Sequence, residues 1–286
     1  MMGKIILNKF MFRGVTLYAL LSTLYLSSCV PLDQLPPGSL PNQTSATNSV
    51  QSYPDIDEPA ATMTTSHFKM RGYRESEIRP VSVTAESIYS KIANDLGLYA
   101  AMSSGSYTLV VYKDRDEFLQ KTKLPPTTRA TSSGTTLYIY PGDGLDSALA
   151  YEMTNLVLTA YLDRQATPSR WIIEGAAMNQ EIGQWSDGER QAYRATQVNE
   201  LHAKRVPFSQ MTFVIPTTKD KRRDDIWYMQ TESVVNYLLT QGSGLAFGAL
   251  LNSLRAGADI DQALAANYPG KFRSLTDLEN AWKYTV

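Results

Sequence analysis

The apolar positions in the second half of the chain recur every three to four residues, and this spacing predicts a succession of amphipathic helices. Glycines follow several of these stretches, as expected where helices end. Asp187 is the expected N-cap of the third helix. Prolines and a basic run over residues 206–224 predict a long loop. Helices are therefore expected at residues 145–162, 170–182, 187–203, 225–241, 244–256, 259–266 and 274–284.

The first half of the chain mixes helical and strand patterns. Residues 84–101 have apolar side chains at helical spacing, with Thr84 as the expected N-cap. Aromatic and β-branched runs at 107–113 and 135–141 predict two strands, and a short helix capped by Asp114 or Asp116 lies between them. Strands followed by helices alone are typical of an α+β protein. We expect a small α/β part over residues 67–144 and a mainly helical part over residues 145–286.

The N-terminus has the pattern of a secretion signal. Lys4, Lys9 and Arg13 precede a mostly apolar stretch that is too short and too polar for a membrane span. The stretch ends in LSSC, which resembles the lipobox of bacterial lipoproteins, and Cys29 is the only cysteine in the chain. The resemblance implies that residues 1–28 are removed and that Cys29 carries lipid chains, palmitate among them, which anchor the protein to a membrane. The alternative is an ordinary signal peptide with an incidental cysteine.

The residues that follow the cysteine indicate where such a protein would lie. In cells with two membranes, aspartate after the lipidated cysteine tends to retain a lipoprotein at the inner membrane. Val30 holds that position. The resemblance therefore implies the outer membrane, facing the periplasm, or the outer face of the cell membrane where there is only one. Residues 29–66 are rich in Pro, Ser, Thr and Asn without periodicity, which predicts a flexible tether.

The charge of the chain excludes one class of partner. Without the three basic residues of the signal segment, 24 of the 27 basic residues remain. Together with the 28 acidic residues they give a net charge of −4. The basic run at residues 219–223 is expected to be a solvated loop, and no basic stripe accompanies it. Nucleic acid is therefore not an expected partner.

Residues 151–155 read YEMTN where a zinc peptidase would read His-Glu-x-x-His. Positions i and i+4 lie on one face of a helix, so both imidazoles of such a motif reach one ion. The intervening glutamate activates the water bound to zinc. In this chain Tyr151 and Asn155 hold the two ligand positions, and Glu152 holds the position of the general base.

The flanking sequence resembles the peptidase MA-like family of gluzincin metallopeptidases. The resemblance covers roughly residues 80–284 and implies a zincin-like fold. It places Glu174 at the third zinc-ligand position, and the strand at 135–140 at the edge along which substrate lies. The matching residues around the second predicted helix are Pro168, Trp171, Glu174, Gly175 and Ala177.

The departure from the family falls on the two histidine positions. A phenol and an amide are poor zinc ligands, and water without a metal is not primed for attack. No cofactor is therefore expected, and Tyr151 and Asn155 are expected to hydrogen-bond Glu174 in the vacated volume. Glu152 would be an ordinary surface residue or would pair with Arg170 or another base.

Other metal sites remain as alternatives. His67 and His202 are the only histidines. His67 lies at the boundary of the predicted tether, and His202 is expected to be a surface or packing residue, with metal ligation as the alternative. Glu174, Glu152 and the Asn155 amide could hold calcium or magnesium, although such ions favour six or more oxygen ligands.

The sequence thus predicts a membrane-anchored bacterial lipoprotein whose peptidase-like domain no longer performs catalysis and serves binding or scaffolding in the cell envelope. An extended peptide or an envelope protein would be held between the strand at 135–140 and the helix at 145–162. The alternative is an active hydrolase with an atypical metal site, zinc included, and Glu152 as general base. Candidates for lining the cleft are Tyr138, Tyr140, Trp171 and Tyr228.

Overall fold

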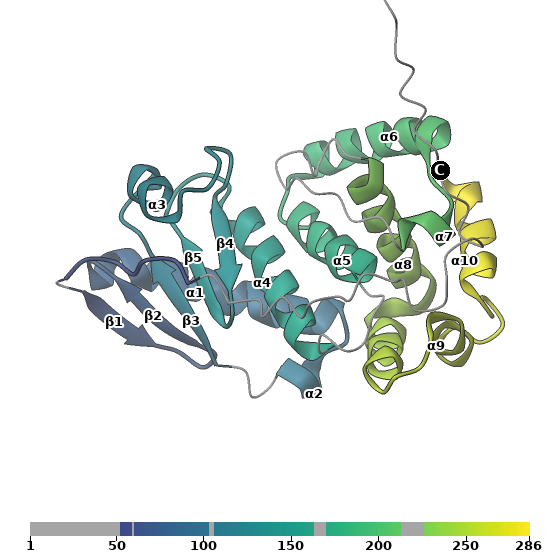
Figure 1. Cartoon of the computed structure of the whole chain (residues 1–286), viewed down its shortest axis with the longest axis horizontal. Coiled ribbons are helices and arrows are strands. Elements are labelled where there is room, and N and C mark those ends of the chain that lie inside the picture. The colour runs from purple at the N-terminus through teal and green to yellow at the C-terminus, as the bar shows by residue number, and fades with distance from the viewer. Residues whose placement is uncertain (1–51, 59, 103–105, 163–169, 213–225) are drawn as a thin grey trace, which may run out of the picture. The chain divides into compact units, whose positions relative to one another are not determined.

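The computed structural model of the protein describes residues 52–58, 60–102, 106–162, 170–212 and 226–286. All of these residues fall within the unit Asn48–Val286. The predicted signal segment, the lipidation site Cys29, and the basic run at 219–223 lie outside the described residues. An N-terminal part with a mixed sheet is followed by a helical part, which confirms the predicted α+β organisation (Figure 1).

A five-stranded sheet forms the centre of the N-terminal part. Its order is β1-β2-β3-β5-β4, with β2, β3 and β5 parallel and with β1 and β4 antiparallel at the two edges. A two-residue turn at Gly134 and Thr135 joins β4 to β5. The strands are β1 (Ala61–Thr64), β2 (Phe68–Gly72), β3 (Tyr107–Val111), β4 (Ala130–Ser133) and β5 (Thr136–Ile139).

The two faces of the sheet are covered differently. Helices α1 (Glu75–Asp95) and α4 (Leu145–Tyr161) pack on one face, and the short α2 (Tyr99–Met102) follows α1. The other face is covered by α3 (Arg115–Thr122) and by Tyr53, Ile56 and Ala60, which cluster with the aromatic side chains of the sheet. Alternation along the strands separates the faces, because successive side chains point to opposite sides.

Helix α8 is the central element of the helical part. It packs against α5, α6 and α9, and α5 packs between α4 and α8. Gly175 permits the close approach of α5 to α8, because a Cβ at this position would lie 2.4 Å from the carbonyl oxygen of Thr231. The helices are α5 (Arg170–Ile182), α6 (Asp187–Lys204), α7 (Phe208–Met211), α8 (Ile226–Arg255), α9 (Ile260–Asn267) and α10 (Leu275–Trp282), and a 3-10 turn (Lys283–Thr285) ends the chain.

By length and composition, α8 could cross a membrane, and it is the one helix in the described ranges that meets this criterion. Core helices of soluble proteins meet the same criterion. Val234, Leu238 and Leu251 of α8 are fully buried among the neighbouring helices. These side chains of α8 therefore contribute to the hydrophobic core of the helical part.

Three predicted boundaries need correction. The tether prediction for residues 29–66 is too long, because Ile56 is buried and residues 61–64 form β1. Helix α1 starts at Glu75 instead of Thr84, since its buried stripe continues upstream on both sides of Pro80. The N-cap of α6 is Ser186, which forms a capping box with Glu189, and not Asp187.

Helix α8 contains both of the helices predicted at 225–241 and 244–256, and a kink divides them at the predicted break. Within it Ser243 has φ 63° and ψ 173°, a conformation that is almost restricted to glycine. Its neighbour Gly244 packs against the C-terminal end of α1, where a Cβ would lie 2.4 Å from the carbonyl oxygen of Asp95. The kink therefore lets the backbone of α8 dock on the backbone of α1.

Replacing Ser243 with glycine is expected to raise the free energy of unfolding by about 1 kcal/mol, because glycine adopts this conformation without strain. Gly244→Ala is expected to lower it, because the added Cβ meets backbone. Gly188→Ala is the matched control, since no atom lies within 4 Å of a Cβ there. Urea denaturation measures all three. A Ser243→Gly protein less stable than the unmodified chain would contradict the assignment of strain.

Candidate functional site

The candidate site lies where α4 and α5 pack side by side. The apolar sequence of α4 buries both of its faces, so Tyr151 on this helix is enclosed by protein. Asn155 follows one turn later on the same side, as the i, i+4 spacing requires. Glu174 projects from the second turn of α5, and its side chain is 1% exposed.

The three positions predicted from the zinc motif converge on one carboxylate oxygen. The Tyr151 hydroxyl donates a hydrogen bond to Glu174 Oε2. The Asn155 amide Nδ2 lies 3.5 Å from the same oxygen, in position to donate a longer bond. The expectation that Tyr151 and Asn155 hydrogen-bond Glu174 is thus confirmed.

Arg170 completes this cluster. Its guanidinium forms an ion pair with Glu174 Oε1 from one turn earlier on α5. The buried carboxylate therefore has a positive charge at one oxygen and hydrogen-bond donors at the other. Arg170 was expected from the sequence only as a partner of Glu152. The i, i+4 spacing of Arg170 and Glu174 on one helix is the signal that could have identified the pair.

Glu152 faces the sheet. Its side chain is 6% exposed, and Glu152 Oε2 accepts a hydrogen bond of 2.9 Å from the Ser132 hydroxyl of β4. The interpretation of Glu152 as a surface residue is therefore wrong. A buried carboxylate bound to the edge strand fixes β4 against α4.

The predicted substrate edge is not where the sequence analysis placed it. Strand β5, which covers most of residues 135–140, is paired on both sides by β3 and β4. The edge strand beside α4 is β4, which the sequence analysis missed because ATSS is short and polar. A cleft bounded directly by β5 and α4 is therefore excluded.

The four aromatic residues proposed for the cleft are all buried. Tyr138 and Tyr140 belong to the cluster on the sheet face that α3 covers, away from α4. Trp171 and Tyr228 lie in the main hydrophobic core. None of the four therefore lines an open groove beside the candidate site.

The two histidines do not join the site. His67 Nδ1 lies 2.7 Å from Glu86 Oε2, and its ring stacks on Tyr89 with 4.3 Å between ring centroids. Burial opposes a charged Glu86, but its hydrogen bonds with His67 prevail and lower the pKa of the carboxyl. His202 is exposed on α6. Among the described residues, no three His, Cys, Asp or Glu side chains are grouped so that they could hold a metal ion.

A second buried carboxylate lies in the helical part. Glu232 of α8 is fully buried, and Arg194 of α6 binds both of its oxygens, one of them at 2.8 Å. Gln197 donates to Glu232 Oε2 at 2.7 Å, and Asn179 of α5 donates to Oε1 at 2.9 Å. Burial opposes the charge of Arg194, but the bonds to Glu232 prevail and raise the pKa of its guanidinium. This network joins α5, α6 and α8.

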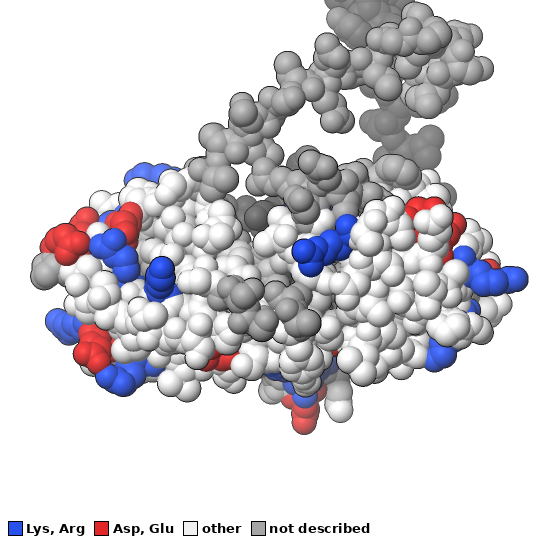
Figure 2. Space-filling model, turned by 90° about the horizontal axis from the view of Figure 1, so that it is seen from below, with Lys and Arg blue, Asp and Glu red and all other residues white. Residues whose placement is uncertain are grey.

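Charged residues of both signs are scattered over the face that Figure 2 shows, and no basic stripe crosses this face among the described residues.

A scan of the chain against protein-family models finds no match, and a search of curated proteins finds none. The resemblance to a peptidase family therefore stays a prediction.

Arg194→Ala is expected to lower the free energy of unfolding by about 3–5 kcal/mol, the typical cost of leaving a buried carboxylate without its partner. Arg190→Ala is the matched control, because Arg190 lies one turn earlier on α6 and pairs with exposed Asp187. That change is expected to cost less than about 1 kcal/mol. Equal losses of stability in denaturant titrations would contradict a structural role for the Arg194–Glu232 pair.

Proposed function

We propose that this chain is a lipid-anchored protein of the bacterial cell envelope with a zincin-like domain that binds an extended peptide and does not hydrolyse it. Cys29 would carry the lipid anchor, and the bound peptide would belong to an envelope partner. The observation that carries the proposal is the closed cluster around Glu174.

The cluster supports a non-catalytic domain because the carboxylate of Glu174 already has an ion pair at one oxygen and a hydrogen bond at the other. In a zinc site of the resembled family, the metal would supply the positive charge beside the glutamate ligand. Here the Arg170 guanidinium supplies that charge, and the Tyr151 hydroxyl takes up the second oxygen. A metal would have to displace both groups from a buried carboxylate.

The edge strand β4 supports peptide binding. In a hairpin with a two-residue turn, Ser133 and Thr136 form the first hydrogen-bonded pair, so Ser132 and Leu137 form a non-hydrogen-bonded pair. The backbone N–H and C=O of Ser132 therefore face away from β5. A peptide that adds to β4 as a further strand needs these groups and needs no metal.

Histidines introduced at the two ligand positions of the motif test whether the cluster has the framework of a zinc site. Tyr151→His combined with Asn155→His and Arg170→Gln is expected to bind one zinc ion per chain, at least about tenfold more tightly than the unmodified chain. The histidines supply two ligands, and the third change frees Glu174. Metal content after dialysis and calorimetric titration with zinc measure the gain.

The control for this experiment retains Arg170 and carries the two histidines alone. It is expected to bind zinc more weakly than the triple variant, because the guanidinium still occupies Glu174. No gain in the folded triple variant would contradict the proposed framework. Stoichiometric zinc in the unmodified chain, with peptide hydrolysis abolished by Glu152→Gln, would instead establish the hydrolase.

The binding role is tested at Ser132. A fluorescent pool of unstructured decapeptides is expected to bind the unmodified chain saturably, and Ser132→Pro is expected to abolish binding because proline removes the outward N–H. Ser132→Ala is the matched control, since it keeps that N–H and removes only the hydroxyl bound to Glu152. Fluorescence anisotropy measures binding. Equal binding by the alanine and proline variants would contradict strand addition at β4.

A further inference from the structure

Residues 53–58, which we call the strap, cover part of the sheet face that lies away from α4. Ile56 is 5% exposed and packs into the aromatic cluster formed by β3, β5 and α3. The ring of Tyr53 meets that of Tyr138 edge-on, with 5.3 Å between centroids. The strap forms no helix or strand. It therefore lies on the sheet as a bound peptide would, with one buried aliphatic anchor.

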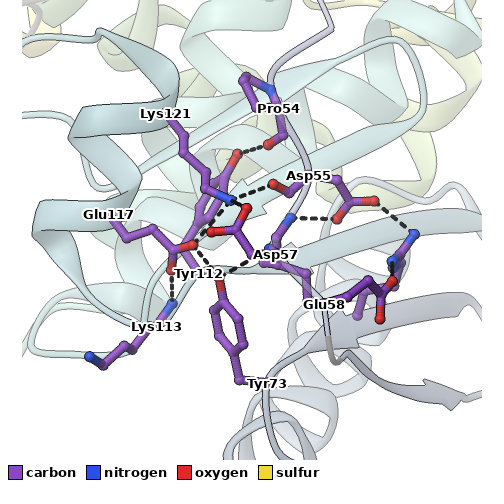
Figure 3. Close-up of polar contacts among 11 residues, drawn as sticks. Pro54, Asp55, Asp57, Glu58, Tyr73, Tyr112, Lys113, Glu117 and Lys121 are labelled. Carbon is purple, nitrogen blue, oxygen red and sulfur yellow. Dashed lines mark hydrogen bonds and ion pairs between the residues drawn. The ribbon is translucent and has the colours of Figure 1, made fainter.

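Side chains of the domain hold the backbone of the strap (Figure 3). The Tyr112 hydroxyl donates to the carbonyl oxygen of Pro54, and Lys121 Nζ donates to that of Asp55 at 2.7 Å. The backbone N–H of Asp57 donates to the Tyr73 hydroxyl at 3.1 Å. The domain thus binds the backbone of the strap at three of its residues.

Charge complementarity adds to these bonds. The strap presents the carboxylates of Asp55, Asp57 and Glu58 to two cations of the domain. Arg71 pairs with Asp55 at 2.8 Å and with Glu58 at 3.1 Å, and Lys121 pairs with Asp57 at 2.9 Å. The domain surface therefore selects an acidic segment with an aliphatic residue between two carboxylates.

The receiving surface is organised by contacts that do not involve the strap. Glu117 Oε1 lies 3.3 Å from Lys121 Nζ and accepts a bond from the Tyr73 hydroxyl. Glu117 Oε2 accepts a bond of 2.7 Å from the backbone N–H of Lys113. Lys121 also lies over the Tyr112 ring, 5.9 Å from its centroid. Because these contacts do not involve the strap, the surface can keep its structure when the strap dissociates.

We propose that the strap is exchangeable and that this surface, when its own strap leaves, binds the strap of a second copy of the chain. The chain's own segment fits the surface through one apolar anchor, three backbone contacts and complementary charge, and a second copy carries the same segment. Exchange of an identical segment between two copies creates a dimer without new kinds of contact. The short connection to β1 favours the chain's own strap at low concentration, because its effective concentration is high.

Two variants of the full chain weaken the binding of the strap, one through a change in the strap and the other through a change in its surface. Ile56→Asp removes the buried anchor and leaves the surface intact, whereas Lys121→Glu leaves the strap intact and repels it from its own domain. Each variant alone is expected to sediment as a monomer. An equimolar mixture is expected to form a one-to-one dimer, because the intact strap of one copy meets the intact surface of the other. Added salt should weaken this dimer.

Lys113→Glu is the matched control for the surface variant. It makes the same charge change nearby, and the Lys113 ammonium lies 4.0 Å from Asp114 with no contact to the strap. Mixed with Ile56→Asp it should stay monomeric, because its own strap remains bound. A monomeric mixture of the folded Ile56→Asp and Lys121→Glu proteins overturns the proposal.

A second pair of variants, with changes that disturb the fold less, is used if either of the first two variants does not fold. Asp57→Lys changes an exposed strap position, and Arg71→Glu changes the other cation of the surface. The same dimer is expected from their mixture, and its absence at every concentration overturns the proposal. A further outcome concerns a peptide of residues 52–58. If it binds the Ile56→Asp chain while both mixtures stay monomeric, the proposal that the surface binds the strap of a second copy is overturned.

Discussion

The buried carboxylate of Glu174 is the constraint on which the arrangement of the candidate site depends. An ionised carboxylate removed from water is unstable unless charge and hydrogen bonds replace its hydration. Arg170 supplies the charge, and Tyr151 supplies a hydrogen bond to the other oxygen. These residues therefore act as one unit with Glu174, and the identity of each depends on whether a metal or a guanidinium neutralises the carboxylate.

Helix α5 connects this site to the rest of the helical part. It carries Glu174 toward α4, while Asn179 donates to the second buried carboxylate, Glu232 of α8. Between these two residues Gly175 allows the backbones of α5 and α8 to come together. Two buried carboxylates in adjacent interfaces need complementary donors at fixed positions, which restricts how α5 can shift or rotate. The position of Glu174 is thus set from both sides of its helix.

The features that could be predicted from the sequence are those that depend on helical periodicity and on the spacing of a motif. The bounds of α5 followed from helical spacing, whereas the meeting of Tyr151 with Glu174 was implied by the resemblance to a zinc-peptidase motif. The strands β1 and β4 could not be found in this way, since four polar or half-buried residues carry little pattern. The edge of the sheet was consequently misplaced. The distant contact between Arg194 and Glu232 depends on tertiary packing, which local pattern does not contain.

Glu152 has a structural role in this chain, although it lies at the position of a general base in the motif that residues 151–155 resemble. In a zinc peptidase the corresponding glutamate activates a water molecule that the metal has primed. In this chain Glu152 is buried and accepts the Ser132 hydroxyl, so it ties the edge strand to α4. The same carboxylate therefore contributes to the placement of β4, whose outward backbone is the part that can receive a peptide. Glu152 thus has a structural role on which the proposed binding of a peptide at β4 would also depend.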